Sequence, residues 1–467
     1  MAIDPRQVCL AEIPKPVHDV PDRLPVIPPD VYRERLRRTR ETMDEQGLDV
    51  LVIYADREHF ANFEYLVGFD PRFEEALLVI RPDELPVVIL GNECFTLAEY
   101  SPIEVTPLLY QEFSLPSQPR DRHRPLTDLL RESGIKQGSR VGIVGWKLFE
   151  RESHDSRDLF DVPHFIIEAV IQATGSPDRL HNATGLFIEP GKGLRTICEV
   201  DQVAVMEYGA VLASNGVHTL IDHLRPGVTE LELGGYLDSK GLPVSCHPMV
   251  STGEKARWAL TSPSSRIVAR GDQFTTAFGV RGGLTCRAGY VAESIDDLKT
   301  SVRDWIDQIV KPYFAAVATW YETIGIGVTG GEVYEAVQKV FPRDRYGWFL
   351  NPGHQIAYDE WLSSPIFPGS QVPLQSGQAL QMDIIPFPSA PYFGVNAEDG
   401  IILADEELRK TIERLHPDMW RRMQARRAFM IEVLGINLKP EVLPMSNYAG
   451  LLRPLLLNKE LALKVRA

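Results

Sequence analysis

Short apolar runs that alternate with helical segments constrain how the first third of this chain can fold. Residues 50–55, 76–81 and 86–90 are short and rich in β-branched residues, as buried strands are, and residues 31–49 carry apolar side chains at helical spacing. Further on, the helical pattern RPLTDLLRESGI precedes the apolar run RVGIVGW. Strands and helices in alternation pack as layers, so we predict an α/β domain over residues 31–190.

The pattern changes in the middle of the chain. Residues 196–227 form one long amphipathic pattern closed by a Pro-Gly pair, and Thr229 is placed to cap a second helix. Sequence rich in β-formers follows at residues 244–290, two further helical patterns come next, and β-rich sequence returns at residues 379–403. This order predicts an α+β domain over residues 191–405, in which a helix pair followed by strands occurs twice.

Two segments flank these domains. Residues 1–30 are polar and proline-rich and lack the apolar stretch of a secretion signal, so we expect an extended arm on the surface. Residues 406–467 are expected to form a helical extension that ends in an apolar tail, LPMSNYAGLLRPLLLN. Such a tail must bury its side chains, and it can do so on the body of the protein or on a second subunit.

Composition and charge exclude several classes of protein. The formal net charge of −15 argues against a broad basic surface for nucleic acid. No apolar run reaches the roughly 18 residues that a membrane span needs. The five cysteines are scattered, odd in number and without a CxxC pair, which indicates reduced thiols in a cytoplasmic protein.

One glycine motif has the spacing of a dinucleotide site but not its context. GIGVTG, residues 325–330, satisfies GxGxxG, yet it joins two predicted helices, whereas a dinucleotide site needs a strand before the glycines. We therefore interpret it as a turn between helices.

Four stretches in a fixed order point to a known family. They are NFEYLVGFDPRFEEALLVI; EVDQVAVMEYGAVLASNGV with LRPGVTELEL; RGDQFTTAFGVRGG; and NPGHQI with SGQALQMDIIP and NAEDGIIL. With these four stretches in this order, the chain resembles the pita-bread-fold family, which includes aminopeptidase P, prolidase, methionine aminopeptidase and creatinase. The resemblance covers residues 30–405 and implies a pita-bread C-terminal domain preceded by an N-terminal α/β creatinase-like domain. It also implies a homodimer.

The resemblance also implies where metal ligands would lie. Active members hold two divalent ions with two aspartates, one histidine and two glutamates, and these fall here, in order, on Ala277, Ala288, His354, Asp383 and Glu398. No carboxylate occurs between residues 273 and 292, so no shift of register restores either aspartate. Because these aspartates would offset much of the charge of two cations, we expect no metal cofactor, or one weakly bound divalent ion on His354, Asp383 and Glu398.

Two further histidines of the peptidases are also missing. Their positions fall on Leu260 and Trp361, which makes the expected pocket more apolar and argues against peptide hydrolysis by the family's usual route. Creatinase, which resembles the peptidases in fold, cleaves a small guanidino substrate without metal. It shows that side chains alone can act on this scaffold.

The remaining polar residues suggest how such a site could work. His354 is the candidate general acid or base, and Asp383 with Glu398 is a candidate carboxylate pair that shares a proton. Candidate substrate-binding residues are Arg281, Arg287, His247 and Trp361. The alternative interpretation is a surface ion pair for each arginine and a structural role for His247.

Three functions remain open at this point. The first is a creatinase- or aminopeptidase P-like enzyme without metal that acts on a C–N bond of a small, carboxylate-bearing substrate by acid-base catalysis. The second is a non-catalytic binding or scaffold protein with the same fold. The third is an atypical metallopeptidase with one ion, similar to Xaa-Pro peptidases.

Overall fold

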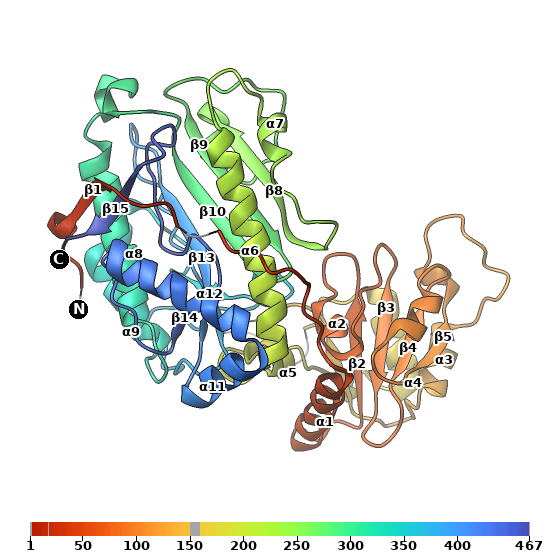
Figure 1. Ribbon diagram of the computed structural model, residues 1–467. Helices are drawn as coiled ribbons and strands as arrows, with labels where there is room; N and C mark the ends of the chain where they lie inside the picture. Colours follow the sequence, from red (N-terminus) through yellow and green to blue (C-terminus); the bar gives the residue numbers. More distant parts are fainter. Residues whose placement is uncertain (1, 17, 150–158, 467) are drawn as a thin grey trace. The chain divides into compact units, whose positions relative to one another are not determined.

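The computed structural model describes residues 2–16, 18–149 and 159–466, which fall into two compact units (Figure 1). The first unit is Ile27–Thr196, and the second combines Met1–Val26 with Ile197–Ala467. The N-terminal residues therefore group with the second unit and not with the domain that follows them. In the described ranges, no helix is both long enough and apolar enough to cross a membrane.

The first unit is built on a six-stranded mixed sheet in the order β5-β4-β3-β2-β6-β7. Its strands are β2 (Val50–Ala55), β3 (Ala76–Ile80), β4 (Val87–Leu90), β5 (Thr106–Leu109), β6 (Val141–Val144) and β7 (Leu180–Asn182). Its helices are α1 (Pro29–Glu45), α2 (Ala61–Val67), α3 (Leu126–Glu132), α4 (His164–Thr174) and α5 (Gly185–Ile188). Every residue of β2, β3, β4 and β6 is buried, which explains why these strands are continuous apolar runs and confirms the α/β prediction.

The second unit contains a seven-stranded antiparallel sheet. Its main path is β11-β12-β13-β10-β9-β8, and β14 pairs with β13. The strands are β8 (Val244–Thr252), β9 (Gln273–Val280), β10 (Gly283–Tyr290), β11 (His354–Gln355), β12 (Ala379–Met382), β13 (Asn396–Leu403) and β14 (Val442–Pro444). Strands from both β-rich stretches of the sequence thus meet in one sheet, at the β10–β13 pairing.

A long helix followed by a Thr-capped helix occurs twice in the second unit. The first pair is α6 (Val200–His223) and α7 (Glu230–Gly234), and the second is α8 (Lys311–Thr323) and α9 (Gly330–Val340). In both pairs a threonine caps the second helix and the glutamate three residues later returns a hydrogen bond, which is the reciprocal capping box. The GIGVTG motif lies between α8 and α9, so its interpretation as a turn between helices is confirmed.

The C-terminal segment is only partly helical. After α11 (Glu406–Leu415), α12 (Pro417–Ala428) and one π-helical turn, the chain runs mostly extended, contributes β14 to the sheet and ends in β15 (Leu461–Val465). β15 pairs antiparallel with β1 (Val8–Glu12) of the N-terminal arm. The apolar tail is buried within this unit, because its leucines and methionine must leave water. The segment thus has a helical first part and a mostly extended, buried second part.

A buried cluster of charges fastens α12 to α6. Glu207 on α6 accepts hydrogen bonds from Arg422 Nε and Nη2 at 2.9 and 2.8 Å, and Arg426 Nη2 lies 2.7 Å from the same carboxylate. Glu207 is 1% exposed. A carboxylate this deeply buried offsets two buried guanidinium groups, so its removal leaves both without their counter-charge.

We expect Glu207→Ala to lower the free energy of unfolding by about 3–5 kcal/mol, because the two arginines then stay buried and uncompensated. The measurement is urea denaturation of the full chain followed by circular dichroism. Glu406→Ala is the matched control: its ion pair with Lys410 is solvent-exposed, and such pairs contribute about 1 kcal/mol or less. Equal effects of the two substitutions would contradict the assignment.

Candidate active site

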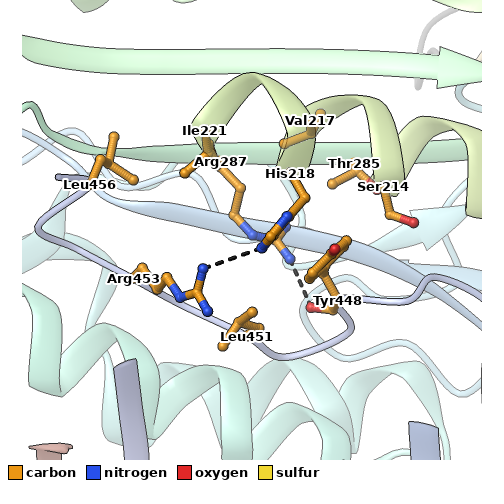
Figure 2. Close-up of a pocket in the computed structure, with 10 residues that line it drawn as sticks. All are labelled: Ser214, Val217, His218, Ile221, Thr285, Arg287, Tyr448, Leu451, Arg453 and Leu456. Atoms are coloured by element: carbon orange, nitrogen blue, oxygen red, sulfur yellow. Dashed lines mark hydrogen bonds between the residues drawn. The ribbon is translucent and has the colours of Figure 1, made fainter. Parts of the chain in front are cut away.

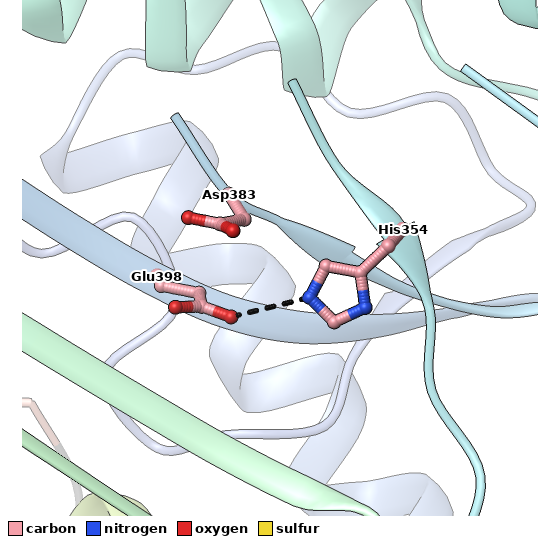
Figure 3. Close-up of side chains that lie close together, drawn as sticks. All are labelled: His354, Asp383 and Glu398. Carbon is pink, nitrogen blue, oxygen red and sulfur yellow. Dashed lines mark ion pairs between the residues drawn. The ribbon is translucent and has the colours of Figure 1, made fainter. Parts of the chain in front are cut away.

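Three neighbouring strands bring His354, Asp383 and Glu398 together (Figure 3). His354 begins β11, Asp383 directly follows β12, and Glu398 lies on β13. Met382 of β12 pairs with Asp399 of β13, so the next position along β12 meets the previous position along β13. The antiparallel register therefore sets Asp383 beside Glu398. The resemblance had placed two metal ligands at these positions.

The three side chains are buried and incompletely hydrogen-bonded. They are 1 to 4% exposed, and one ligand atom from each lies within 4.8 Å of the other two. His354 Nδ1 is 3.0 Å from the Gln355 carbonyl, so Nδ1 carries the proton and Nε2 is left with a lone pair. Nε2 lies 3.5 Å from Glu398 Oε1. Among the described residues, Asp383 Oδ1 and Glu398 Oε1 have no hydrogen-bond partner, which leaves both oxygens available to a ligand.

Burial dominates the electrostatics of the cluster. It raises the pKa of Glu398 to about 8 and, together with the charge of Glu398, raises the pKa of Asp383 well above its usual range. Burial also lowers the pKa of His354. All three shifts favour the uncharged forms, because a low-dielectric site disfavours charge that nothing compensates. In the protein alone, burial therefore reduces the charge that these three groups carry.

The cluster lies in a cavity of about 470 Å³ whose walls are largely apolar. Ala277 and Ala288, on which the resemblance places the family's two aspartates, both line it. They come from adjacent strands, since β9 pairs with β10. The structure thus places methyl groups where two carboxylates would face His354.

Trp361 closes one side of the cluster. Its ring stacks on the imidazole of His354, with centroids 4.1 Å apart and planes inclined by 15°. Leu260, on which the resemblance places the other peptidase histidine, lines the same cavity and is largely exposed. Both substitutions therefore bear on the pocket itself, and Trp361 is in contact with the candidate general base.

Arg287 does not lie in this pocket, which corrects the placement expected from the sequence. Its guanidinium pairs with Asp399 at 2.8 Å and donates to the carbonyls of Glu398 and Tyr448. Cys286 and Ala288 line the pocket, and successive side chains of a strand alternate between the faces of a sheet. Arg287, between them, must therefore face the other side.

Arg281 and His247 also lie away from the cluster. Arg281 stands in the hairpin between β9 and β10 with φ 45°, and its guanidinium lies 5.7 Å from the ring centroid of Tyr358. It is not among the residues that line the cavity. His247 is an exposed residue of β8 and is also outside the lining.

Two polar residues of the cavity were not assigned a role from the sequence. Glu360 lines the cavity next to Trp361, and burial raises its pKa. Arg257 lies in the 3₁₀ turn Gly253–Trp258 after β8 and brings a cation to the pocket, with no ion-pair partner among the described residues. Neither residue belongs to a strand, so the alternation of side chains along a strand could not have predicted that they face the pocket.

The donor set fits one metal ion but not two. A histidine nitrogen and two carboxylates within 4.8 Å, with unpaired oxygens on both acids, match the N/O ligands of a single divalent ion with an open position. A second ion would need further carboxylates, and the two positions where the resemblance expects them are Ala277 and Ala288. The residues present therefore allow a mononuclear site and do not fit a dinuclear one.

Comparisons with known proteins confirm the resemblance. Residues 35–153 match the creatinase/prolidase N-terminal domain, and residues 204–405 match metallopeptidase family M24. Together the two matches cover more than half of the chain. The protein therefore belongs to the pita-bread-fold family of creatinases, prolidases and aminopeptidases P.

Solved structures show the same fold at low identity. A prolidase from Thermococcus sibiricus is 19% identical with a TM-score of 0.62, covering 80% of this chain and 95% of that one. An Xaa-Pro dipeptidase from Bacillus anthracis is 18% identical with a TM-score of 0.59, covering 80% and 96%. Among curated proteins, the uncharacterized peptidase YqhT of Bacillus subtilis is 24% identical over 224 residues. That match spans 45% of this chain and 61% of YqhT.

We expect the purified protein to bind at most one divalent ion per chain, because the described residues offer one set of His, Asp and Glu ligands within metal-binding distance. Elemental analysis after dialysis against Mn²⁺, Co²⁺ or Zn²⁺ measures this. The double variant Ala277→Asp/Ala288→Asp restores both carboxylates and should raise the content toward two ions. His354→Ala should remove the single ion where one binds. Two equivalents in the natural chain would contradict the ligand assignment.

Proposed function

We propose that this protein hydrolyses a C–N bond of a small substrate by acid-base chemistry at His354, Asp383 and Glu398. The observation that carries the proposal is the buried cluster itself, with a histidine Nε2 3.5 Å from a glutamate oxygen and unpaired oxygens on both acids. A cavity of about 470 Å³ next to these atoms is large enough for a small molecule. Activities of the pita-bread relatives, which include prolidases and dipeptidases, point to the same bond class.

The two carboxyl groups and His354 can take separate roles in hydrolysis, as the acid and the base. Two carboxyl groups this close together hold one proton more readily than two charges, so one of them can act as the acid toward the leaving nitrogen. His354 offers an unprotonated Nε2 that can accept a proton from water. Stacking against Trp361 and the hydrogen bond to Gln355 keep the ring oriented for this role.

The walls of the cavity indicate the class of substrate. Phe387, Tyr392 and Phe393 line one part of it together with the prolines at 386, 388 and 391. Arg257 adds a cation without an ion-pair partner among the described residues, so it can bind a carboxylate. We therefore propose a substrate that carries a carboxylate and an apolar group. Arg257 would bind the carboxylate, in place of Arg281 and Arg287, which were the candidates from the sequence.

A second candidate function is a mononuclear metallopeptidase. It is favoured by the distances among the three ligand atoms, which suit one divalent ion. Such an ion would be held by His354, Asp383 and Glu398 and would supply a Lewis acid beside the substrate carbonyl. For either function, we also propose that the ligand is a small molecule, that the protein forms a homodimer and that it is located in the cytoplasm.

Substitution of the cluster tests the proposed function. With Xaa-Pro dipeptides, N-acyl amino acids and amidines as a substrate panel, His354→Ala and Glu398→Gln should each lower kcat/KM by about 10²- to 10⁴-fold, since each removes a proton carrier. Glu406→Gln, on an exposed helix face, is the control and should retain full activity. Turnover that survives both cluster substitutions would rule out this site.

Metal removal separates the two candidate functions. Activity that persists after dialysis against a chelator is expected for acid-base catalysis by side chains alone. Loss of activity that one equivalent of a divalent ion restores would establish the mononuclear alternative instead. Absence of both turnover and ligand-induced thermal stabilisation across the panel would favour a non-catalytic binding protein.

The proposed binding of a substrate carboxylate by Arg257 has its own test. Arg257→Met keeps the length of the side chain but removes the charge, so KM for a carboxylate-bearing substrate should rise about tenfold or more while kcat changes little. The same substitution should leave KM unchanged for the corresponding amide of that substrate. An equal effect on both substrates would exclude a role for Arg257 in binding the carboxylate.

A further inference from the structure

One wall of the large cavity is a face of the antiparallel sheet. Alternate residues of β9 and β10 line it: Gln273, Thr275, Ala277, Cys286 and Ala288. Two other residues of β10, Thr285 and Arg287, line a separate cavity of about 20 Å³ behind the sheet, together with residues of α6 and the C-terminal segment (Figure 2). The two sets of side chains thus face opposite sides of the sheet, as the alternation along a strand requires.

The strand register arranges the cavity-facing residues in two rows across β9, β10 and β13. The first row consists of Ala277, Cys286 and Glu398, which pair across the strands. The second row, two residues further along each strand, consists of Thr275, Ala288 and Asn396. Positions two residues apart on a strand are separated by about 7 Å. The second row therefore lies about 7 Å from the Glu398 row, which contributes to the candidate active site.

The second row places two neutral polar side chains on either side of a methyl group. Thr275 is 9% exposed and Asn396 is 8% exposed, so bulk water reaches little of either residue. Asn396 Oδ1 has no hydrogen-bond partner among the described residues. A buried amide that lacks a partner costs free energy, which a ligand in the cavity can recover. Rotation about the last side-chain bond lets either end of the amide face such a ligand.

The small side chain of Ala288 leaves the space between the two polar residues open. Neighbouring strands are about 4.8 Å apart, so the backbones at Thr275 and Asn396 lie about 10 Å from each other across β10. A carboxamide has a donor and an acceptor with which to bridge the two side chains. Thr and Asn offer donors and acceptors but no charge, which suits a neutral amide better than a carboxylate or an ammonium group.

We propose that Thr275 and Asn396, on either side of Ala288, form an amide subsite that binds a carboxamide of the substrate. The proposal rests on the proposed function and adds a substrate class to it: N-acyl amino acids with a glutamine-like side chain. The acyl C–N bond lies at Glu398, and the side-chain carboxamide lies over Ala288. A glutamine-like side chain spans about the distance between the two rows, and its α-carboxylate remains free to bind Arg257.

Three ligands of similar length test the amide subsite. N-acetyl-L-glutamine carries a neutral amide, whereas N-acetyl-L-methionine carries a thioether and N-acetyl-L-glutamate a second carboxylate. The dissociation constant of the glutamine compound should be about 10- to 100-fold lower than that of the other two, because they leave the polar groups unpaired or bury a charge. Calorimetry on the His354→Ala variant measures binding without turnover. The thermal shift of the natural chain ranks the same ligands independently of how that variant folds.

Substitutions in the second row assign the preference to its residues. Thr275→Val and Asn396→Leu nearly keep the size of each side chain and should each remove most of the preference for the glutamine compound, whereas Thr275→Ser keeps the hydroxyl and should retain it. Thr276→Val is the matched control. Thr276 is the next residue along β9 and does not line the cavity, so its substitution should leave the preference unchanged.

The results separate the amide subsite from the proposed hydrolysis. Preferential binding of N-acetyl-L-glutamine without turnover would support the amide subsite and contradict the hydrolysis. Equal binding of the three ligands, or no binding of N-acetyl-L-glutamine, would overturn the amide subsite even where other members of the substrate panel are hydrolysed.

Discussion

The buried ion pair between Arg287 and Asp399 fixes the geometry on which the candidate site depends. Arg287 of β10 reaches Asp399 of β13 at 2.8 Å and donates to the carbonyl of Tyr448 in the C-terminal segment. One guanidinium thus joins two central strands and the segment behind them. Because side chains alternate along β13, holding Asp399 behind the sheet requires Glu398 to point into the pocket.

The same alternation explains what could and could not be predicted from the sequence. The buried strands of the first unit and the ligand positions His354, Asp383 and Glu398 were predictable, because apolar runs and ordered motifs determine them locally. Ala288 faces the pocket, and side chains alternate along a strand, so Arg287 must face away from it. The prediction that Arg287 binds the substrate did not take this alternation into account.

Other parts of the site depend on irregular or distant structure. Glu360 and Arg257 reach the pocket from loop and 3₁₀ segments, where no periodicity relates sequence position to direction. The small cavity behind the sheet needs α6, β10 and residues near 450 to converge, and nothing in the local sequence of any one of them indicates the other two. Contacts between segments so far apart are set by the tertiary fold alone.

The pairing of β1 with β15 has a consequence for the order in which the protein folds. The first unit is a continuous stretch of chain and can acquire its sheet while later residues are still being synthesised. The N-terminal arm leaves the ribosome before that unit, yet the strand that pairs with it is made only after both sheets. The arm must therefore wait through the synthesis of nearly all the intervening chain, and its docking completes the second unit after translation of β15.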